Sequence, residues 1–428
     1  MGSPPRFQAP TGTLDVLPPA SARWEELLAL FAITVGRAGY GLVINPMFED
    51  IGVFLRGIGE GSEVVTKEMY EFRDKGDRHL ALRPEGTASV ARAFIQHRPA
   101  LPFKAWYATP AFRYERPQAG RYRQHHQIGL EAFGVEDPEL DVEVVSLASD
   151  FYRAVGLRQV SLKINSMGDE QCRPAYVELL RAFLAERADQ LCDEHRTKFE
   201  INPLRVLDCK RAECIAATER APAITDHLCE ACRAHYGAVL SGLDDLGVAY
   251  SPEFRLVRGF DYYTRTTFEF AAEALGTAQN AAGGGGRYDG LVESLGGPPT
   301  PGIGFGMGIE RLLMACDAEG AMAGSGPGLD AFVIDVMGGR RATLIAHELR
   351  AAGLRVDRAF DGRSMKSQMK AADRSGAVVA VIIGEEEAAA GVATLRPLRG
   401  DEEQVKVPRA ELADAVRRMG AGKTGEKP

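Results

Sequence analysis

The chain has 428 residues, a length that suits two or three domains. Hydrophobic residues make up 45% and charged residues 26%, which is ordinary for a globular protein and supplies a core without disulfide staples. The net charge of −8 argues against a generally basic nucleic-acid-binding protein, although the part from Leu329 onward holds 17 Lys and Arg against 15 Asp and Glu.

Neither a membrane segment nor a secretory signal is visible. The most apolar stretch, near Leu27 to Val35, is too short to span a bilayer, and the N-terminus has prolines in place of a hydrophobic signal region. The odd number of cysteines, seven, favours free thiols or a metal in a reducing compartment over a disulfide framework. We therefore expect a cytoplasmic protein that has no contact with a membrane.

The first part of the chain predicts helices around an antiparallel sheet. Residues 1–20 are rich in Pro and Gly and are expected to be extended. Apolar side chains at helical spacing predict a helix over residues 22–38. Between residues 69 and 133 the period shortens to two, with Pro and Gly breaks, which predicts antiparallel strands. Another helix is predicted over residues 138–155.

The rest of the chain changes character three times. Residues 169–250 have apolar side chains at helical spacing and frequent charges, and six of the seven cysteines lie in or beside this stretch, which we interpret as a helical insertion. Strands and a final helix return over residues 251–322. Residues 323–328 (AGSGPG) are typical of a linker. Residues 329–420 alternate strand and helix as in a small α/β domain, and residues 421–428 are expected to be a disordered tail.

The segment from Phe112 to Gly134 predicts a hairpin that carries chemistry. Alternate side chains of a strand share a face, so Arg113 and Glu115 point one way, and Gln127 and Glu131 share a face of the return strand. The other face of the return strand is apolar and can pack on a core. The connecting loop adds further polar side chains: Arg116, Gln118, Arg121 and Arg123.

Converging guanidinium groups suit phosphate, whose oxygens they bind in pairs. The alternative is a solvated strand face with surface ion pairs. We favour a ligand site, because glycine and glutamine stand among the charges.

Two segments, residues 281–291 and 301–312, place many glycines inside apparent strands, where glycine is unfavourable unless something approaches closely. In GIGFGMG the glycines alternate, which would leave one sheet face bare enough for a flat ring to lie against it. Arg311 follows at the start of a helix, within reach of a phosphate. The pattern is neither the dinucleotide fingerprint nor a P-loop, and tight packing is the alternative explanation.

Several motifs then resemble one family. The FRYE start of the hairpin, GFGMGIERL, and the first helix with GYGLVINPMFED resemble motifs 2, 3 and 1 of class II aminoacyl-tRNA synthetases. Within that class, LRPEGT, RPQAGRYRQHHQIG and LVRGFDYYTRTTFEF resemble histidyl-tRNA synthetases. Ser62–Glu63 and Phe260 depart from the usual Thr-Asp and Leu, and neither departure touches a proposed catalytic group.

The resemblance covers nearly the whole chain and implies an α+β fold. It implies a catalytic core with an antiparallel sheet flanked by helices, in two parts, residues 1–168 and 251–322, on either side of the helical insertion. Residues 329–420 resemble the family's anticodon-binding domain. Motif 1 implies a homodimer.

The activity implied is a ligase reaction in two steps. The enzyme would activate L-histidine with ATP to histidyl-adenylate and pyrophosphate, and then transfer histidine to the 3′-terminal adenosine of tRNA-His. ATP is a substrate, and Mg²⁺ is expected on its phosphates. The histidine carboxylate, with a pKa of roughly 3.5, is already ionised and needs no general base.

The resemblance also implies roles for individual residues. The catalytic residues would be Arg113 and Arg258. The residues binding ATP would be Arg113, Glu115, Arg311 and either Arg121 or Arg123, of which we select Arg121. The residues binding histidine would be Glu85, Gly86, Thr87, Gln127, Glu131, Tyr262 and Tyr263. Candidates for the acceptor end of the tRNA are Arg116 and Gln118. Candidates for the anticodon, unless they only form a solvated helix face, are Arg363, Lys366 and Lys370.

The cysteines leave a metal site open. Cys209 and Cys214, followed by Cys229 and Cys232, form a C-x4-C…C-x2-C pattern, with Cys192 and His195 nearby, and thiolates at such spacing can close a tetrahedral zinc site. We favour free thiols over a structural zinc ion, because helical segments between the pairs do not require them to converge.

Two other functions are considered. One is a non-catalytic, synthetase-like regulatory subunit of ATP phosphoribosyltransferase, but such paralogues lose catalytic arginines and the C-terminal domain, which this chain keeps. The other is an RNA-binding protein on an α+β scaffold, which does not explain the glycine-lined faces and the carboxylates.

Overall fold

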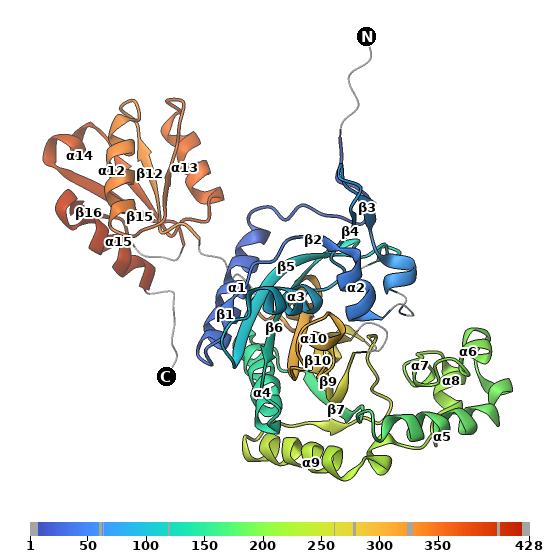
Figure 1. Ribbon diagram of the computed structural model, residues 1–428. Helices are drawn as coiled ribbons and strands as arrows, with labels where there is room; N and C mark the ends of the chain where they lie inside the picture. Colours follow the sequence, from blue (N-terminus) through green and yellow to red (C-terminus); the bar gives the residue numbers. More distant parts are fainter. Residues whose placement is uncertain are drawn as a thin grey trace. The chain divides into compact units, whose positions relative to one another are not determined.

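The computed structural model describes residues 7–59, 62, 64–118, 120–260, 262–276, 280–322, 328–399 and 403–421. The chain divides into two compact units, Met1–Ser325 and Gly326–Pro428, which are described separately below (Figure 1). Residues 323–327 of the predicted linker, the predicted tail beyond Ala421, and Glu63 lie outside the described residues.

The first unit is built on an eight-stranded sheet in the order β1-β5-β6-β11-β10-β9-β7-β8. Neighbouring strands from β5 to β7 in this order all run antiparallel, as the sequence predicted, whereas β1 and β8 pair in parallel at the two edges. The strands are β1 (Gly41–Leu42), β5 (Phe103–Phe112), β6 (Gln124–Phe133), β7 (Val160–Ser166), β8 (Ser251–Pro252), β9 (Thr264–Ala272), β10 (Ala281–Arg287) and β11 (Gly302–Gly308).

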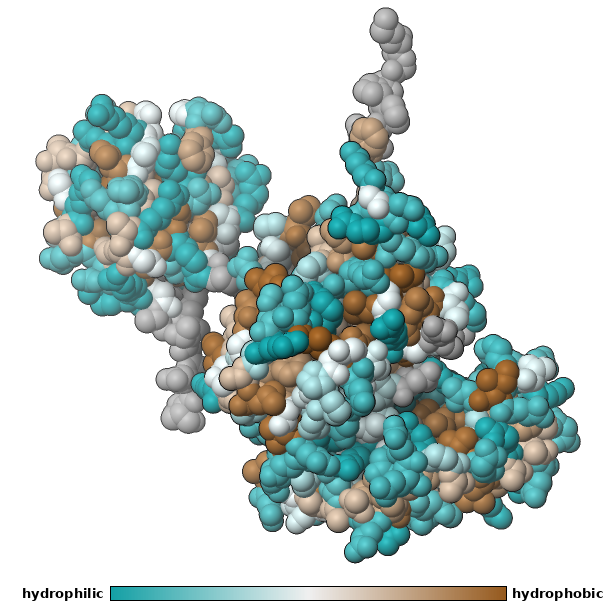
Figure 2. All heavy atoms as spheres, viewed as in Figure 1, coloured by the Kyte–Doolittle hydropathy of each residue, from teal (hydrophilic) through white to brown (hydrophobic). Residues whose placement is uncertain are grey.

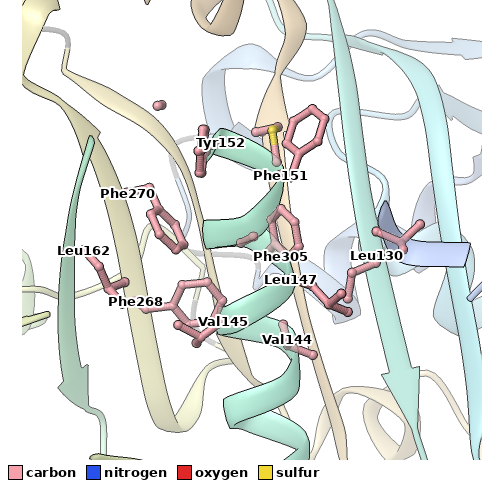
Figure 3. Close-up of a cluster of buried hydrophobic side chains, with 14 of the residues drawn as sticks. Leu130, Val144, Val145, Leu147, Phe151, Tyr152, Leu162, Phe268, Phe270 and Phe305 are labelled. Atoms are coloured by element: carbon pink, nitrogen blue, oxygen red, sulfur yellow. The ribbon is translucent and has the colours of Figure 1, made fainter. Parts of the chain in front are cut away.

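One face of this sheet carries the main hydrophobic core. α4 (Pro138–Val155) packs on it, with α1 (Ala20–Gly36), α9 (Glu230–Asp245) and α11 (Ile309–Glu319) around it. Figure 3 shows α4 against the sheet, with core side chains of the strands around it, among them Leu130, Leu162, Phe268 and Phe305. The bounds of α4 confirm the helix predicted over residues 138–155. The helix begins and ends there because Asp137 accepts a hydrogen bond from the backbone N–H of Glu139, and Gly156 ends the helix with a φ of 91°.

The other face is partly covered by α3 (Thr87–His97), which the sequence analysis assigned wrongly to the sheet. Pro and Gly breaks around this short segment suggested strands, but its apolar side chains Val90, Ala91 and Phe94 are spaced for a helix and are buried. A three-stranded sheet and further short helices lie near α3: β2 (Phe48–Asp50), β3 (Glu71–Arg73), β4 (His79–Leu82), α2 (Ile51–Ile58), a π-helical turn (Val64–Glu68) and α10 (Leu291–Ser294).

The stretch interpreted as an insertion is helical, as predicted. Figure 1 shows α6, α7 and α8 gathered beside α5, away from the eight-stranded sheet, while α9 returns to pack along α4. The elements are α5 (Arg173–Ala185), a 3₁₀ turn (Ala188–Gln190), α6 (Asp193–Lys198), α7 (Leu204–Leu207), α8 (Ala212–Ala217) and a second 3₁₀ turn (Ile224–His227). A third 3₁₀ turn, Glu273–Leu275, follows β9.

The second unit holds a five-stranded sheet in the order β13-β12-β14-β15-β16. The predicted strand and helix alternation is present, but the sequence analysis did not assign β15 and β16, which pair antiparallel and make the sheet mixed. The elements are β12 (Ala331–Asp335), α12 (Arg340–Ala351), β13 (Val356–Arg358), α13 (Met365–Arg374), β14 (Val379–Ile383), α14 (Glu385–Ala390), β15 (Val392–Pro397), β16 (Val405–Pro408), a 3₁₀ turn (Arg409–Glu411) and α15 (Leu412–Ala421).

Across the residues that the structure describes, no helix is both long and apolar enough to cross a membrane.

Candidate active site

A pocket opens on the glycine-rich face of the eight-stranded sheet. Its floor is formed by glycines of two neighbouring strands, Gly283 and Gly284 of β10 and Gly306 and Gly308 of β11. Its walls are charged, with side chains that come from the β5–β6 connection, the loop before β9, β9 itself and the start of α11: Arg113, Glu115, Arg121, Arg258, Glu269, Glu310 and Arg311. The pocket therefore combines a bare floor with guanidinium groups, which is suited to a flat, polyanionic ligand.

The alternating glycines of β11 do share one face, as predicted, because Ile303, Phe305 and Met307 between them are buried in the core on the other face. The glycines serve two purposes, however. A Cβ atom at Gly304 would lie 1.9 Å from Oε2 of Glu131, so this glycine makes room for a protein side chain. The expectation that all four glycines leave space for a ring is thus wrong, and only Gly306 and Gly308 line the pocket.

The two predicted catalytic arginines both reach this pocket and are held in place by protein partners. Nε of Arg113 donates to the carbonyl of Pro84 at 2.9 Å. Nη1 of Arg258 lies 3.1 Å from Oε2 of Glu269. Burial alone would lower the pKa of the Arg258 guanidinium, but Tyr263 and Glu269 raise it. Nε of Arg258 is buried without a protein hydrogen-bond partner among the described residues, as expected of a group that awaits a ligand.

The remaining predicted ATP-binding residues are also brought together. Arg311 donates to the carbonyls of Gly120 and Ala281, at 3.2 and 3.3 Å, which fixes its side chain at the pocket wall. Nε of Arg121 lies 3.6 Å from a carboxylate oxygen of Glu115. Burial and the nearby Arg121 lower the pKa of Arg311, because these cations are gathered without a full complement of anions.

Three other side chains of the connecting loop do not line the pocket. The guanidinium of Arg123 lies 3.9 Å from the ring centre of Tyr114, whereas Arg121 lines the pocket. Arg116 and Gln118 are exposed, with the backbone of Gln118 paired to that of Arg121.

A buried polar cluster continues from the pocket beneath α3. Oγ1 of Thr87 donates to Glu131 at 2.8 Å, and the hydroxyl of Tyr288 donates to the other carboxylate oxygen. Burial raises the pKa of Glu131 to about 8, although both of these hydrogen bonds lower it. Oε1 of Gln127 accepts from the backbone N–H of Gly86 at 3.0 Å.

Glu85 lies at the N-terminus of α3 and accepts from the backbone N–H groups of Thr87 and Ala88, at 2.7 and 2.8 Å. Burial raises the pKa of Glu85, and these hydrogen bonds oppose the effect. The rings of Tyr262 and Tyr263 lie 4.6 Å apart, and burial holds the pKa of both phenols above its usual value, so both remain donors. The structure thus brings all seven predicted histidine-binding residues to one region.

Sequence reasoning missed several residues of the site. His125 lines the pocket, and burial with the neighbouring Arg113 lowers its pKa to about 3, so its ring is neutral. The period-two alternation that selected Gln127 and Glu131 also places His125 on the same face of β6, so the sequence did contain a signal for His125. Tyr107 had no such signal: it pairs opposite Gly129, and this register cannot be deduced from the sequence.

Two residues belong to both parts of the site. Gln127 lines the charged pocket and also holds Gly86 of the buried cluster. Arg258 lines the same pocket, and its guanidinium lies 5.8 Å from the ring centre of Tyr263. The charged pocket and the buried polar cluster therefore meet between Gln127 and Arg258.

Comparisons with known proteins agree with this geometry. Residues 12–312 match the family model described as histidyl-tRNA synthetase, and residues 332–419 match the model described as anticodon binding domain. The histidine–tRNA ligase of Rhodococcus erythropolis is 50% identical over 415 residues, which is 96% of this chain and 97% of that protein. The histidine–tRNA ligase of Mycobacterium marinum is 49% identical over 415 residues, covering 96% of this chain and 98% of that protein.

Solved structures are similar over almost the same length. The apo histidyl-tRNA synthetase of S. aureus matches with a TM-score of 0.79 and 34% identity, over 96% of this chain and 100% of that one. The two matched segments of the sequence and the structural similarity thus indicate the same family. The chain belongs to the histidyl-tRNA synthetase family.

Proposed function

We propose that histidyl-adenylate forms where the charged pocket meets the buried polar cluster, between Gln127 and Arg258. The chain is a histidine–tRNA ligase, a class II aminoacyl-tRNA synthetase that activates histidine and charges tRNA. The single observation that carries the proposal is the direct continuity of an arginine-lined pocket with a buried carboxylate and tyrosine cluster. One part is suited to ATP and the other to a small amino acid.

In the first step, a carboxylate oxygen of histidine bonds to the α-phosphorus of ATP, and the bond to the bridging oxygen breaks, releasing pyrophosphate. Two anions must be held in line while charge grows on the α-phosphate. We assign Arg113 and Arg258 to this charge, since they enter the pocket from different segments and are anchored by Pro84 and Glu269. Loss of one such donor costs on the order of a hundredfold or more in rate.

The other charged side chains of the pocket are assigned to the rest of ATP. Glu115 would face the adenine, with Arg121 and Arg311 on the phosphate tail. Mg²⁺ prefers oxygen ligands and commonly binds through one or two carboxylates together with substrate phosphates. The two other carboxylates of the pocket, Glu269 and Glu310, fit such an ion, which would neutralise phosphate charge.

Histidine recognition is assigned to the buried cluster. Thr87, Gln127 and Glu131 would surround the α-ammonium group, and Glu85 and Tyr263 the imidazole, with Gly86 and Tyr262 completing the wall. Most of these groups are buried, whereas Gln127 and Tyr262 are partly buried. Hydrogen bonds join Gln127 to Gly86 and Thr87 to Glu131, which holds these side chains ready for a substrate of one shape. An amino acid that cannot pair with them would leave buried polar groups without partners, which is strongly unfavourable.

In the second step, a ribose hydroxyl of the tRNA's terminal adenosine attacks the activated carbonyl, and AMP leaves. Arg116 and Gln118 are exposed at the pocket rim loop, where they can meet the acceptor end. The second unit, which matches an anticodon binding domain, would use three exposed cations: Arg363 just before α13, Lys366 in its first turn and Lys370 in its middle.

We also propose that the chain forms a homodimer through motif 1. β1 is an edge strand of the sheet, and the apolar side chains on and after it are exposed, with Leu42 at 53% and Ile44 at 86% of full exposure. Apolar side chains gathered beside an unpaired sheet edge are typical of a surface covered by another chain.

The regulatory-subunit alternative is not favoured. The match to histidine–tRNA ligases covers both units, and Arg113, Arg258 and Arg311 all line one pocket. We place the enzyme in the cytoplasm, because its tRNA substrate is used there in protein synthesis.

ATP–pyrophosphate exchange tests the proposal directly. Of the twenty amino acids, histidine alone should support exchange. Exchange with a different amino acid would leave the reaction in place but contradict the assignment of the buried cluster.

A further inference from the structure

Two groups of metal-ligating side chains lie in and beside the helical insertion. The first, here the histidine–cysteine cluster, consists of Cys192, His195, Cys209 and Cys214. The second, here the aspartate–cysteine cluster, consists of Asp169, Cys172, Cys229 and Cys232. Within each cluster, one ligand atom from every residue lies within 4.8 Å of all the others. The sequence analysis grouped the pair at 209 and 214 with the pair at 229 and 232, and the structure contradicts that grouping.

We propose that the chain binds a structural Zn²⁺ ion in the histidine–cysteine cluster, through three thiolates and Nδ1 of His195. Nδ1 of His195 lies 3.1 Å from Sγ of Cys192 and 3.8 Å from Sγ of Cys214. With zinc bonds of about 2.3 Å to sulfur and about 2.0 Å to nitrogen, ligand atoms at the corners of a tetrahedron lie about 3.5 to 3.8 Å apart. The four donors are therefore already arranged around the volume of one ion.

The surroundings of this cluster suit a closed structural site. Cys192 and Cys214 are buried, and Cys209 is partly buried. The backbone N–H of Cys192 donates to Sγ of Cys214 at 3.4 Å, which fixes the position of this sulfur within the cluster. Three thiolates and a neutral imidazole around Zn²⁺ leave one negative charge, and Lys210 and Arg211, which follow Cys209, can balance it.

The helices that carry the ligands are too short to be stable without a further interaction that holds them together. α6 has six residues, α7 four and α8 six, far fewer than an isolated helix needs to be stable in water. The four ligands come from the start of α6, its first turn, the loop after α7, and α8. One ion would therefore tie together three helices whose own hydrogen bonds are too few, as in small zinc domains.

The aspartate–cysteine cluster independently supports a second zinc ion. Oδ1 of Asp169 lies 3.4 Å from Sγ of Cys172 and 3.7 Å from Sγ of Cys229, again close to tetrahedral edges. The backbone N–H of Cys232 donates to Sγ of Cys229 at 3.5 Å, which places these two thiols at the N-terminus of α9. Three thiolates and one carboxylate complete a set of four ligands.

The second ion would join the insertion to the active site. Asp169 and Cys172 stand where the chain leaves β7, whereas Cys229 and Cys232 stand at the start of α9, the last helix of the insertion. Arg173, next to Cys172, donates to the carbonyls of Met167 and Tyr263, and Tyr263 belongs to the buried polar cluster that we assign to histidine. The beginning of the insertion and the start of its last helix would thus be fastened together beside Tyr263.

The test is to purify the full-length, untagged protein without chelators and to measure its metal content by elemental mass spectrometry. We expect two zinc ions per chain. Cys209→Ser should remove one ion and Cys229→Ser the other; both replace partly buried thiols, which limits damage to the core. Cys316→Ala removes a buried cysteine outside both clusters and should keep both ions.

Cobalt substitution gives a second measurement that does not depend on the variants folding. Wild-type protein reconstituted with Co²⁺ should show the intense visible bands of tetrahedral cobalt bound to thiolates. Wild-type protein with no zinc, or a metal content that Cys209→Ser leaves unchanged, would overturn the first proposal. An unchanged content in Cys229→Ser would overturn the second, and disulfides within the clusters would overturn both.

Discussion

Glu131 is a carboxyl group of the buried polar cluster, and burial raises its pKa to about 8. It is 1% exposed and lies near a second buried carboxyl, that of Glu85, so its charged form is unfavourable until a cation arrives. The proposed cation is the α-ammonium group of histidine. Binding of histidine should therefore release a proton from Glu131 at neutral pH.

The stability of the ligand-free protein should depend on this group. A carboxyl whose pKa rises from 4.5 to about 8 on folding binds more protons in the native state between these values, so the contribution of Glu131 to stability is fully present below pH 4.5 and is lost as the pH rises to 8. Glu131→Gln removes the ionisation, and the free energy of unfolding at pH 8.5 should rise by on the order of a few kcal/mol relative to wild type.

The same variant should weaken histidine binding. In wild type, the apparent Kd for histidine, measured by calorimetry, should decrease as the pH rises toward 8, and in Glu131→Gln this slope should disappear. Glu219→Gln, at an exposed position, is the matched control and should keep the wild-type profile. An unchanged slope in the Glu131 variant would show that the proton is released elsewhere.

The two arginines at 121 and 123 provide another comparison at the residue scale. Arg121 lines the charged pocket, whereas Arg123 lies over the ring of Tyr114. Arg121→Ala should raise the KM for ATP about tenfold or more with little change in the KM for histidine, because one charge-assisted contact to phosphate is lost. Arg123→Ala should have a smaller effect on ATP. Equal effects of the two substitutions would contradict the assignment of Arg121.

At the scale of elements, β6 and β11 together form the centre of the site. Their antiparallel register sets Gly304 opposite Glu131, and Gly308 opposite Gln127. The absence of side chains on one face of β11 lets the polar side chains of β6 lie flat across it. The glycines of β11 therefore make the space that the polar side chains of β6 occupy.

Two glycine substitutions separate these roles. In Gly304→Ala the new Cβ would lie 1.9 Å from the Glu131 carboxylate and 2.4 Å from the backbone carbonyl of Leu130, which cannot move away. We expect a loss of stability of about 1–3 kcal/mol or more, and loss of histidine-dependent exchange. In Gly308→Ala the Cβ meets no atom within 4 Å, so thermal unfolding should be unchanged. Wild-type stability and activity in Gly304→Ala would contradict this packing.

These two strands also show what the sequence could reveal. Period-two alternation identified the polar face of β6 and the bare face of β11, because in a strand the face of a side chain follows from its position alone. It could not show which strand lies beside which. The position of Tyr107 against Gly86 and Gly129 depends on that pairing, and so it was missed.

The predictions for α3 and for the grouping of the cysteines failed for related reasons. α3 is short, and its buried side chains are mostly small, so its helical period was weak against the Pro and Gly breaks around it. The cysteines were paired by closeness in the sequence, but Cys209 and Cys214 meet Cys192 and His195, while Cys229 and Cys232 meet residues from the beginning of the insertion. Convergence of distant segments is a tertiary property that spacing does not contain.

At the scale of the whole molecule, the proposed dimer rests on the exposed apolar residues beside the β1 edge. Wild-type protein at micromolar concentration should sediment with twice the 46.3 kDa mass of one chain. Ile44→Glu introduces a charge into this surface and should shift the equilibrium to the monomer. Ile201→Glu, at an equally exposed position of the insertion, is the matched control and should remain dimeric. A monomeric wild type would contradict the assignment of this surface.

The two units have different parts in the proposed function. The first holds the whole of the proposed adenylation site, and the second matches an anticodon binding domain. Amino-acid activation should therefore need only contacts within the first unit, which makes it the step that reports most directly on the site.

The most direct test of this account is ATP–pyrophosphate exchange with each of the twenty amino acids, using wild type, Arg258→Ala and the control Arg153→Ala, whose side chain is 70% exposed on α4. We predict exchange with histidine alone, reduced on the order of a hundredfold or more in Arg258→Ala and unchanged in the control. Absence of exchange with any amino acid from folded wild-type protein, or full activity of Arg258→Ala, would contradict the account.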